Sequence, residues 1–253
     1  MNAIIRTAIV RTAFWVCLFC VQPIAADTPS PLEIGDTKLI TPFHVEYTVG
    51  NNLINAGVAK LTLEAQGDEW VYSLVTKPSG IFKLTGKGRI HEVSVINVTQ
   101  EQLIPQRYSY RQAGDQKKRD VDAVFNWQNQ ELTIKRKGKE ETEVLTDPIL
   151  DRLSVTLTVM ELVRKGFSSA ELQVLDAGKI KTMQFINDGT ERVDTKLGTL
   201  DTIVVRRVRE GSSRETITWF APDLNYVPVQ IEQRKRGKLV ARLKINKLKN
   251  QPE

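Results

Sequence analysis

The stretch Thr218-Trp219-Phe220-Ala221-Pro222-Asp223-Leu224-Asn225-Tyr226-Val227-Pro228-Val229 decides how the rest of the chain is interpreted. Two runs rich in aromatic and β-branched residues lie on either side of an Ala-Pro-Asp break. Strand-forming residues around a Pro-Asp turn are typical of a β-hairpin. Trp219 and Tyr226 flank the predicted turn, and no reactive group stands out in the stretch. We therefore expect it to form a corner of a sheet.

The same pattern of short apolar runs and polar turns repeats on both sides of this hairpin. Strands separated by turns at a spacing of about 8–12 residues are typical of an antiparallel sandwich or barrel. The rhythm predicts a mainly β protein, with a large curved antiparallel sheet or an open β-barrel. Strands are predicted near 43–49, 56–65, 70–76, 81–84, 90–98, 103–111, 121–127, 131–137, 142–145, 171–175, 179–188, 191–195, 198–208, 215–221, 227–234 and 239–248. Gly57 lies inside a predicted strand, which indicates a bulge or a close approach of two backbones.

One segment, residues 147–166, departs from the strand rhythm. Asp147 and Pro148 are an N-cap residue and a first-turn proline, and Gly166 follows two basic residues at the other end. Apolar residues in between recur at spacings of three and four. These signals predict one main helix over about 148–165, although its Val and Thr residues favour strands. We expect Asp151 and Ser154 on the helix surface.

The first 26 residues have the pattern of a secretory signal peptide. Arg6 and Arg11 precede a short apolar run, and small residues end at Ala26. The run is shorter than the roughly 20 residues that span a bilayer, so we predict cleavage, with retention as an anchor as the alternative. Cleavage predicts a periplasmic protein with a flexible lead-in over 27–41, a single β-rich domain over 42–249 and a tail over 250–253. Both cysteines, Cys17 and Cys20, would leave with the signal peptide.

The charge of the chain is mildly basic. There are 36 Lys and Arg against 30 Asp and Glu, and loss of the two signal-peptide arginines lowers the net charge from +6 to +4. No nucleic-acid recognition motif is present. Two basic runs, Lys135-Arg136-Lys137 and Arg234-Lys235-Arg236, lie at predicted hairpin ends. They suit anionic envelope polymers, and they also suit the protection of strand edges against aggregation.

Residues of catalytic or metal-binding type are scattered. His44 and His91 are the only histidines of the chain, and neither has a partner at a metal-binding spacing. Acid pairs at Glu140-Glu141 and Asp120/Asp122 are the residue type that a glycosidase needs, but they fall in turns and at polar strand positions. We therefore predict no catalytic residue, no metal site and no cofactor.

The aromatic residues are the remaining candidates for a binding site. A curved sheet with one helix encloses an apolar cavity in several β folds. Ordinary core packing explains the same residues equally well. The predicted ligand-binding residues are Trp70, Trp127, Trp219, Phe220 and Tyr226.

Several elements in order resemble one bacterial family. They are Phe43-His44-Val45-Glu46-Tyr47, the strand with Gly57, Leu103-Ile104-Pro105-Gln106-Arg107-Tyr108, Asp151-Arg152-Leu153-Ser154 and the hairpin from Trp219 to Val229. The family is the one catalogued as domain of unknown function 3108, and the likeness extends over about 42–248. It implies a secreted β-rich envelope protein and assigns no catalytic residue. A looser likeness to periplasmic lipoprotein carriers concerns the fold alone.

Three functions remain open from the sequence. The first is non-enzymatic binding of a hydrophobic or lipidic ligand, or of an envelope partner, with an apolar cavity that includes Trp219 or Trp127. The second is a hydrolase of envelope glycans, which needs carboxylates or a histidine converging in a cleft. The third is a scaffold or assembly factor that uses a long unpaired apolar strand edge. The sequence predicts no nucleic-acid partner and no membrane span after signal cleavage, and leaves the oligomeric state open.

Overall fold

The structure is a computed structural model that describes residues 41–51, 54–80, 87–99, 102–114, 119–145 and 148–250. All of them belong to one compact unit, Pro31–Glu253. The predicted signal peptide, nearly all of the lead-in and the last three residues of the tail lie outside the described residues. The domain boundaries drawn from the sequence therefore stay predictions.

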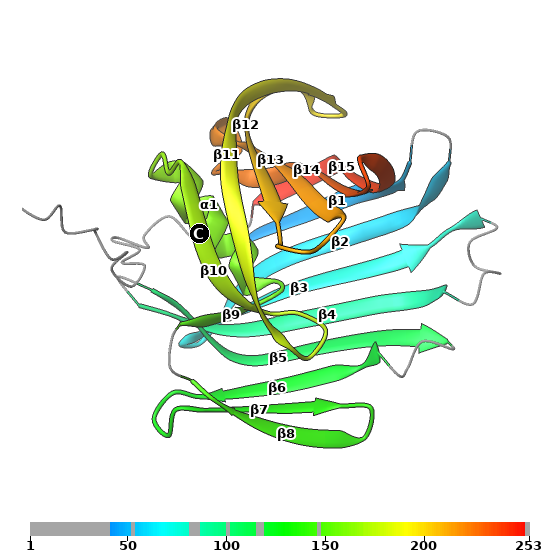
Figure 1. The fold of residues 1–253 in the computed structure, drawn as a ribbon. Coiled ribbons are helices and arrows are strands. Elements are labelled where there is room, and N and C mark those ends of the chain that lie inside the picture. Colours follow the sequence, from blue (N-terminus) through cyan, green and yellow to red (C-terminus); the bar gives the residue numbers. More distant parts are fainter. Residues whose placement is uncertain are drawn as a thin grey trace, which may run out of the picture. The chain divides into compact units, whose positions relative to one another are not determined.

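In the part of the chain that the structure describes, fifteen strands form a single open sheet (Figure 1). The strands are β1 (Phe43–Gly50), β2 (Asn55–Gln66), β3 (Glu69–Pro78), β4 (Lys87–Val98), β5 (Leu103–Gly114), β6 (Val121–Asn126), β7 (Glu131–Arg136), β8 (Lys139–Val144), β9 (Ile149–Asp151), β10 (Ser169–Leu175), β11 (Ile180–Thr195), β12 (Gly198–Val208), β13 (Arg214–Ala221), β14 (Val227–Lys235) and β15 (Lys238–Asn250). The predicted fold class is confirmed.

The strand order is two meanders joined in the middle. Strands β1 to β8 follow each other on one side, β15 to β9 follow each other on the other, and β1 pairs with β15 at the joint. Neighbouring strands are antiparallel except for β9 and β10, which are parallel. The sheet is therefore mixed, with β8 and β9 as its two edges.

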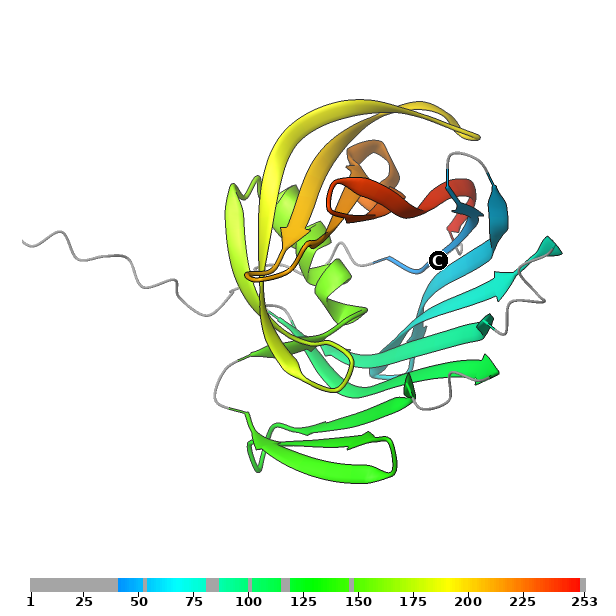
Figure 2. The same ribbon diagram turned by 45° about the vertical axis from the view of Figure 1, so that its right-hand side comes forward.

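The curved sheet encloses the helix α1 (Ser154–Arg164) on its concave side, next to β10 and β11 (Figure 2). Nine of its eleven residues are buried, which is the pattern of a helix packed on all sides. The predicted start near Pro148 is wrong, because Ile149–Asp151 pairs with β10 as the short strand β9. Asp151 and Ser154 are both fully buried, which corrects their predicted place on the helix surface.

The core lies between the concave face and α1. Val45 and Tyr47 of β1 point inward and are buried, and so are Leu61 and Leu63 of β2. These residues alternate along their strands because successive strand residues face opposite sides of the sheet. A second, smaller core holds Phe125 and other residues of β5, β6 and β7, with Leu145 after β8, against β9 and β10. This second core connects the extension β6–β8 to the other edge of the sheet.

Strands β5 and β9 lie against each other without pairing through the backbone. We call this junction the seam. The strands β1–β5 and β9–β15 curve toward it from both sides, and β6–β8 continue beyond it (Figure 1). Because no ladder hydrogen bonds cross the seam, side chains must hold it together.

Three local predictions have clear outcomes. The hairpin is confirmed, since β13 ends at Ala221, a 3-10 turn covers Pro222–Leu224 and β14 begins at Val227. Gly57 is a close backbone approach, because a Cβ there would lie 2.3 Å from the Lys77 carbonyl oxygen. The predicted break between the strands 179–188 and 191–195 is wrong, because β11 continues through it with a shift of register between Asn187 and Gly189.

Candidate ligand-binding cavity

A cavity of about 130 Å³ lies between α1 and the concave face. The pairing register explains its wall. Val205 of β12, Thr218 of β13, Ile231 of β14 and Leu243 of β15 are successive partners across four strands, and all four line the cavity. Phe220 closes this side of the wall.

The opposite wall comes from β1–β4 and α1. Leu61 and Leu74 are partners on β2 and β3, and Val155 and Val159 project from α1 one turn apart. These four side chains make the middle of this wall apolar. On the same wall, the Tyr72 hydroxyl is buried and has no hydrogen-bond partner among the described residues.

A charged group forms one end of the cavity. Glu92 is 1% exposed and accepts a hydrogen bond of 2.6 Å from the Tyr108 hydroxyl. The Arg152 Nε lies 3.4 Å from the same carboxylate oxygen, and its guanidinium stacks 5.5 Å above the Tyr110 ring. The negative charge of Glu92 raises the pKa of Arg152. This ion pair crosses the seam, because Glu92 is on β4 and Arg152 follows β9.

Asp151 lies beside this pair and holds the start of α1. Its carboxylate accepts hydrogen bonds from the Ser94 hydroxyl at 2.5 Å and from the backbone N–H groups of Leu153 and Ser154 at 2.8 and 3.0 Å. Its own N–H donates to the Ser154 hydroxyl at 2.8 Å. Burial nevertheless raises the pKa of Asp151 to about 6. Asp151 therefore anchors the helix and titrates near neutral pH.

Arg207 is the second cationic group of the cavity wall. Its Nη2 donates a hydrogen bond of 2.8 Å to the Thr216 hydroxyl, its partner across β12 and β13. Burial and then the nearby charge of Arg152 lower the pKa of Arg207. Within the described part of the chain it has no carboxylate within ion-pair distance. Arg152, in contrast, has both Glu92 and Asp176 within 4 Å.

The comparisons with known proteins identify the family. The profile of the family described as "Protein of unknown function (DUF3108)" matches residues 43–244. The chain belongs to the DUF3108 family. The match covers the sheet from β1 into β15 and includes every cavity residue named above. A comparison with curated proteins gives no match.

A solved structure shows a fold similar to that of this DUF3108 protein. It is the crystal structure of a beta-barrel-like protein of domain of unknown function DUF1849 from Brucella abortus, with a TM-score of 0.54 and 9% sequence identity. The similarity covers 84% of this chain and 99% of that one. At this identity the likeness concerns the fold alone.

The structure separates the five predicted ligand-binding residues of this DUF3108 protein. Phe220 lines the 130 Å³ cavity, and Tyr226 lines a small pocket of about 40 Å³ at the other end of α1. Trp219 points away from the main cavity, and its indole N–H donates a hydrogen bond of 2.8 Å to Glu191. Phe220 is therefore the one of the five that lies on the main cavity, and ligand contact by any of them stays a prediction.

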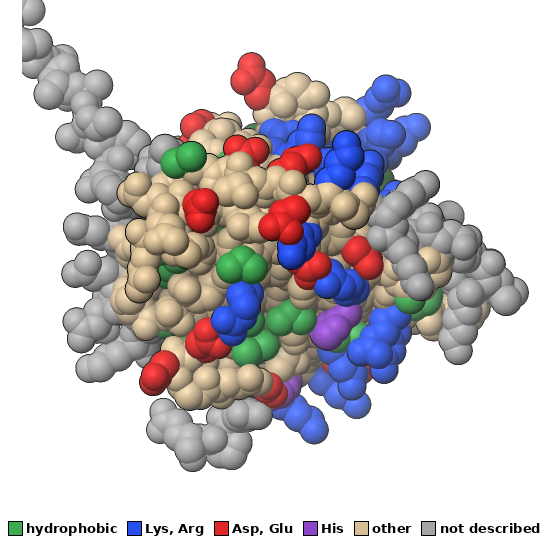
Figure 3. All heavy atoms as spheres, turned by 90° about the horizontal axis from the view of Figure 1, so that it is seen from below, with side chains coloured by type: hydrophobic (Ala, Val, Ile, Leu, Met, Phe, Trp, Pro, Cys, Tyr) green, Lys and Arg blue, Asp and Glu red, His purple; other side chains and the backbone are tan. Residues whose placement is uncertain are grey.

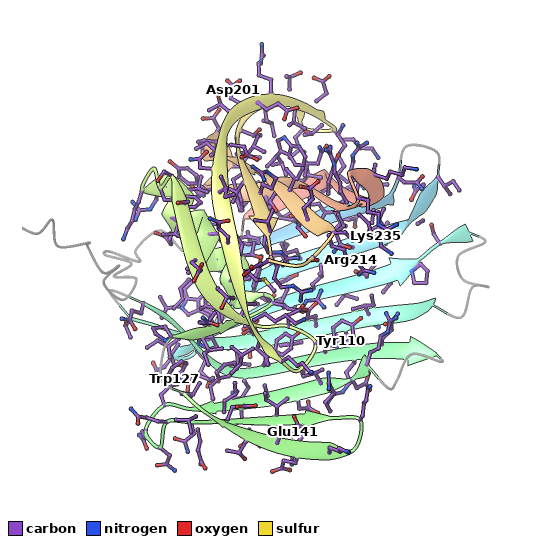
Figure 4. The ribbon with its side chains drawn as sticks, in the orientation of Figure 1. Tyr110, Trp127, Glu141, Asp201, Arg214 and Lys235 are labelled. Carbon is purple, nitrogen blue, oxygen red and sulfur yellow. The ribbon has the colours of Figure 1, made fainter. Side chains whose placement is uncertain are left out.

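The other two tryptophans lie elsewhere. Trp127 belongs to the second core, where it stacks on Phe125 and donates a hydrogen bond of 2.6 Å to the Pro105 carbonyl. Figure 4 shows it beyond β5, on the side of the extension. Trp70 is half-buried and packs against the main core. Both positions are explained by core packing.

The predicted acid pairs do not converge. Glu140 and Glu141 are exposed on the edge strand β8 (Figure 4). Asp122 forms a surface ion pair with Arg111, and Asp120 accepts a hydrogen bond from the Gln112 backbone. The described residues contain no group of three His, Cys, Asp or Glu arranged for a metal ion. None of their helices is long and apolar enough to cross a bilayer.

Sequence reasoning missed the polar residues of the cavity, namely Glu92, Arg152 and Arg207. A signal existed for Glu92. In the strand Ile90-His91-Glu92-Val93-Ser94-Val95, alternation alone would turn Val93 and Val95 inward. The structure instead buries Glu92 and Ser94 and leaves the two valines half-buried on the outer face. The inner face of this part of β4 is therefore polar, and its valines lie on the outer face.

Proposed function

We propose that this DUF3108 protein is a non-enzymatic binding protein that holds a hydrophobic or lipidic ligand on the concave side of its sheet. The main support is the cavity between α1 and the concave face of the sheet, whose lining includes apolar side chains from α1, β2, β3 and β12–β15. An engineered apolar cavity of about 150 Å³ accommodates benzene, so the present volume suits a short hydrocarbon chain. The N-terminal pattern described above supports the periplasm as the compartment.

The distribution of acidic groups favours binding over glycan hydrolysis. A glycosidase places two carboxylates about 5–9.5 Å apart around the scissile bond. Here Glu92 is the acidic residue of the cavity wall, and it already accepts the Tyr108 hydroxyl and pairs with Arg152. Asp151 is directed to Ser94 and to the amides that begin α1. A carboxylate in such contacts has a structural role.

The sheet edges also disfavour a scaffold that works by strand addition. The edge strand β8 has the sequence Lys-Glu-Glu-Thr-Glu-Val, and all six residues are exposed. Charged edges oppose pairing with another chain. The other edge, β9, has three residues, all of them buried.

Mass spectrometry of material extracted from natively purified protein tests the proposal. We expect a hydrophobic small molecule to co-purify in stoichiometric amount. A Thr218→Phe variant, which fills the cavity, should lose it. Thr190→Phe is the matched control, because Thr190 is an exposed residue of β11. Equal ligand content in both variants, or no ligand in the wild type and no binding of added 1-octanol, would contradict the proposal.

A further inference from the structure

Three features of the cavity and its rim indicate that the proposed ligand carries a charged group besides its apolar part. They are the half-buried Arg207, the balance of charge in the cavity wall, and a group of basic residues beside the same strand ends. They rest on observations independent of the apolar lining. Together they specify the chemical class of the ligand, and this inference depends on the proposed function.

Arg207 has spare capacity for hydrogen bonds. A guanidinium carries five N–H donors in a planar fork, and the recorded partner of Arg207 is the neutral Thr216 hydroxyl. Partial withdrawal of a charge from water is costly unless a counter-charge pairs with it. Since no carboxylate of the described chain lies within ion-pair distance of Arg207, an anion brought by a ligand would gain a charge-assisted, bidentate contact there.

The charges in the wall of the cavity leave this site cationic. Arg152 and Arg207 are positive and Glu92 is negative. Glu92 is engaged by Arg152 and Tyr108, and Asp176, the next acid, is bound by Lys181 at 2.5 Å. The excess positive charge therefore resides at Arg207.

The rim near Arg207 is also basic. Arg214 and Lys235 are register partners where β13 begins and β14 ends, and Figure 4 shows their side chains close to each other there. Arg207 pairs with Thr216, and Thr216 with Gln233, so the rim lies two residues farther along the same strands. Arg209, Arg236 and Lys238 extend it, and Glu210 is its exposed acid. Lys235 and Arg236 of the basic run thus belong to this rim, whereas Arg234 forms an ion pair with the buried Glu232.

We propose that the ligand is an anionic amphiphile, an apolar chain with a carboxylate or phosphate head, and that Arg207 binds the head while the chain enters the cavity beneath Phe220. The basic rim attracts the anion from solution. The unpartnered Tyr72 hydroxyl, on the opposite wall of the same cavity, is a second, neutral donor.

Isothermal titration calorimetry with four probes tests this proposal. Octanoate and octyl phosphate carry the two kinds of head, 1-octanol has the same chain without charge, and acetate has the charge without the chain. We expect octanoate or octyl phosphate to bind about tenfold to a hundredfold more tightly than 1-octanol, the range of one charge-assisted contact. The better of the two identifies the head, and acetate should not bind measurably.

The variants Arg207→Gln and Arg206→Gln form a matched pair. The two arginines are adjacent on β12 and face opposite sides of the strand, and Arg206 pairs with Asp188 at the surface. Both variants lose one charge, so long-range attraction changes equally. We expect Arg207→Gln to remove the preference for the anion and Arg206→Gln to keep it, with Arg207→Lys in between. Circular dichroism checks that each variant is folded.

The possible failures are distinguishable. If 1-octanol and the anions all fail to bind, the proposed function falls. If 1-octanol binds as tightly as octanoate and octyl phosphate, or if both glutamine variants weaken the anions equally, apolar binding stands and the role of Arg207 is refuted. If acetate binds as tightly as octanoate, the site is one for free anions and the amphiphile is refuted.

Discussion

The Ser94 hydroxyl donates a hydrogen bond of 2.5 Å to the Asp151 carboxylate, and this contact joins β4 to β9 across the seam. The ion pair of Glu92 with Arg152 crosses at the same level. Neighbouring strands elsewhere in the sheet are joined by backbone hydrogen bonds. At the seam, buried polar side chains supply the hydrogen bonds instead. Buried polar contacts are specific in geometry and costly when half satisfied.

The first prediction concerns this contact. Ser94→Ala should lower the free energy of unfolding by about 1–3 kcal/mol, because it leaves part of the buried Asp151 carboxylate without a donor. Urea denaturation followed by fluorescence measures the change. Ser73→Ala on β3, at a half-buried position of the outer face, is the control and should change stability by less than about 0.5 kcal/mol. Equal effects of the two substitutions would contradict the role of the seam.

The second prediction follows from the pKa of Asp151. Burial raises it from 3.8 to about 6, so the folded protein binds this proton more tightly than the unfolded chain. The protonated Asp151 therefore adds to the free energy of unfolding. This contribution is complete below pH 3.8, is lost as the pH rises through about 6, and is about 3 kcal/mol at most. Asp151→Asn should flatten stability between pH 4 and 7 relative to the wild type, as measured by urea titrations at each pH. A parallel pH dependence in both proteins would refute the assignment.

The third prediction separates Trp219 from Phe220. Trp219→Phe removes the hydrogen bond to Glu191 and should cost about 1–2 kcal/mol of stability without changing the affinity for 1-octanol. Phe220→Leu alters the cavity wall and should change that affinity. Thermal denaturation and calorimetry measure the two effects. A loss of 1-octanol binding in Trp219→Phe at unchanged stability would place Trp219 in the binding site instead.

The fourth prediction concerns the edge strand β8. Glu141 and Glu143 are exposed there beside Val144, which is 67% exposed. Replacing both acids by valine should produce concentration-dependent oligomers, because charge no longer opposes edge-to-edge pairing. Size-exclusion chromatography with light scattering detects this. Glu141→Gln/Glu143→Gln should associate less, and a monomeric valine variant would contradict the role of the charges.

The basic residues of the surface bear on the proposed ligand binding as well. Figure 3 shows Lys and Arg side chains gathered toward one side of the face seen from below, while acidic side chains are spread over the rest. An uneven distribution of this kind gives the association rate a dependence on ionic strength.

The strands were predictable because alternation is a local property, and the hairpin was predictable because Pro222 and Asp223 specify a turn. Non-local pairing overruled two local signals. Residues 149–151 pair with β10 and displace the helix start. The Asn187 side chain donates to the Phe167 carbonyl at 2.9 Å, so an apparent turn is a bulge within β11. Arg207 was not predictable, because two adjacent arginines are indistinguishable until the register turns one of them inward.

The joint between β1 and β15 has a consequence for folding. It pairs residues about two hundred positions apart, such as Tyr47 with Ile245, whereas the pairs within each meander are local. Contacts of high sequence separation slow folding, because the loop entropy is lost before the contact forms. The two meanders can therefore form early, and the joint forms only after β15 is available. During synthesis, a chain of this topology therefore stays without its central joint until its last strand has been made.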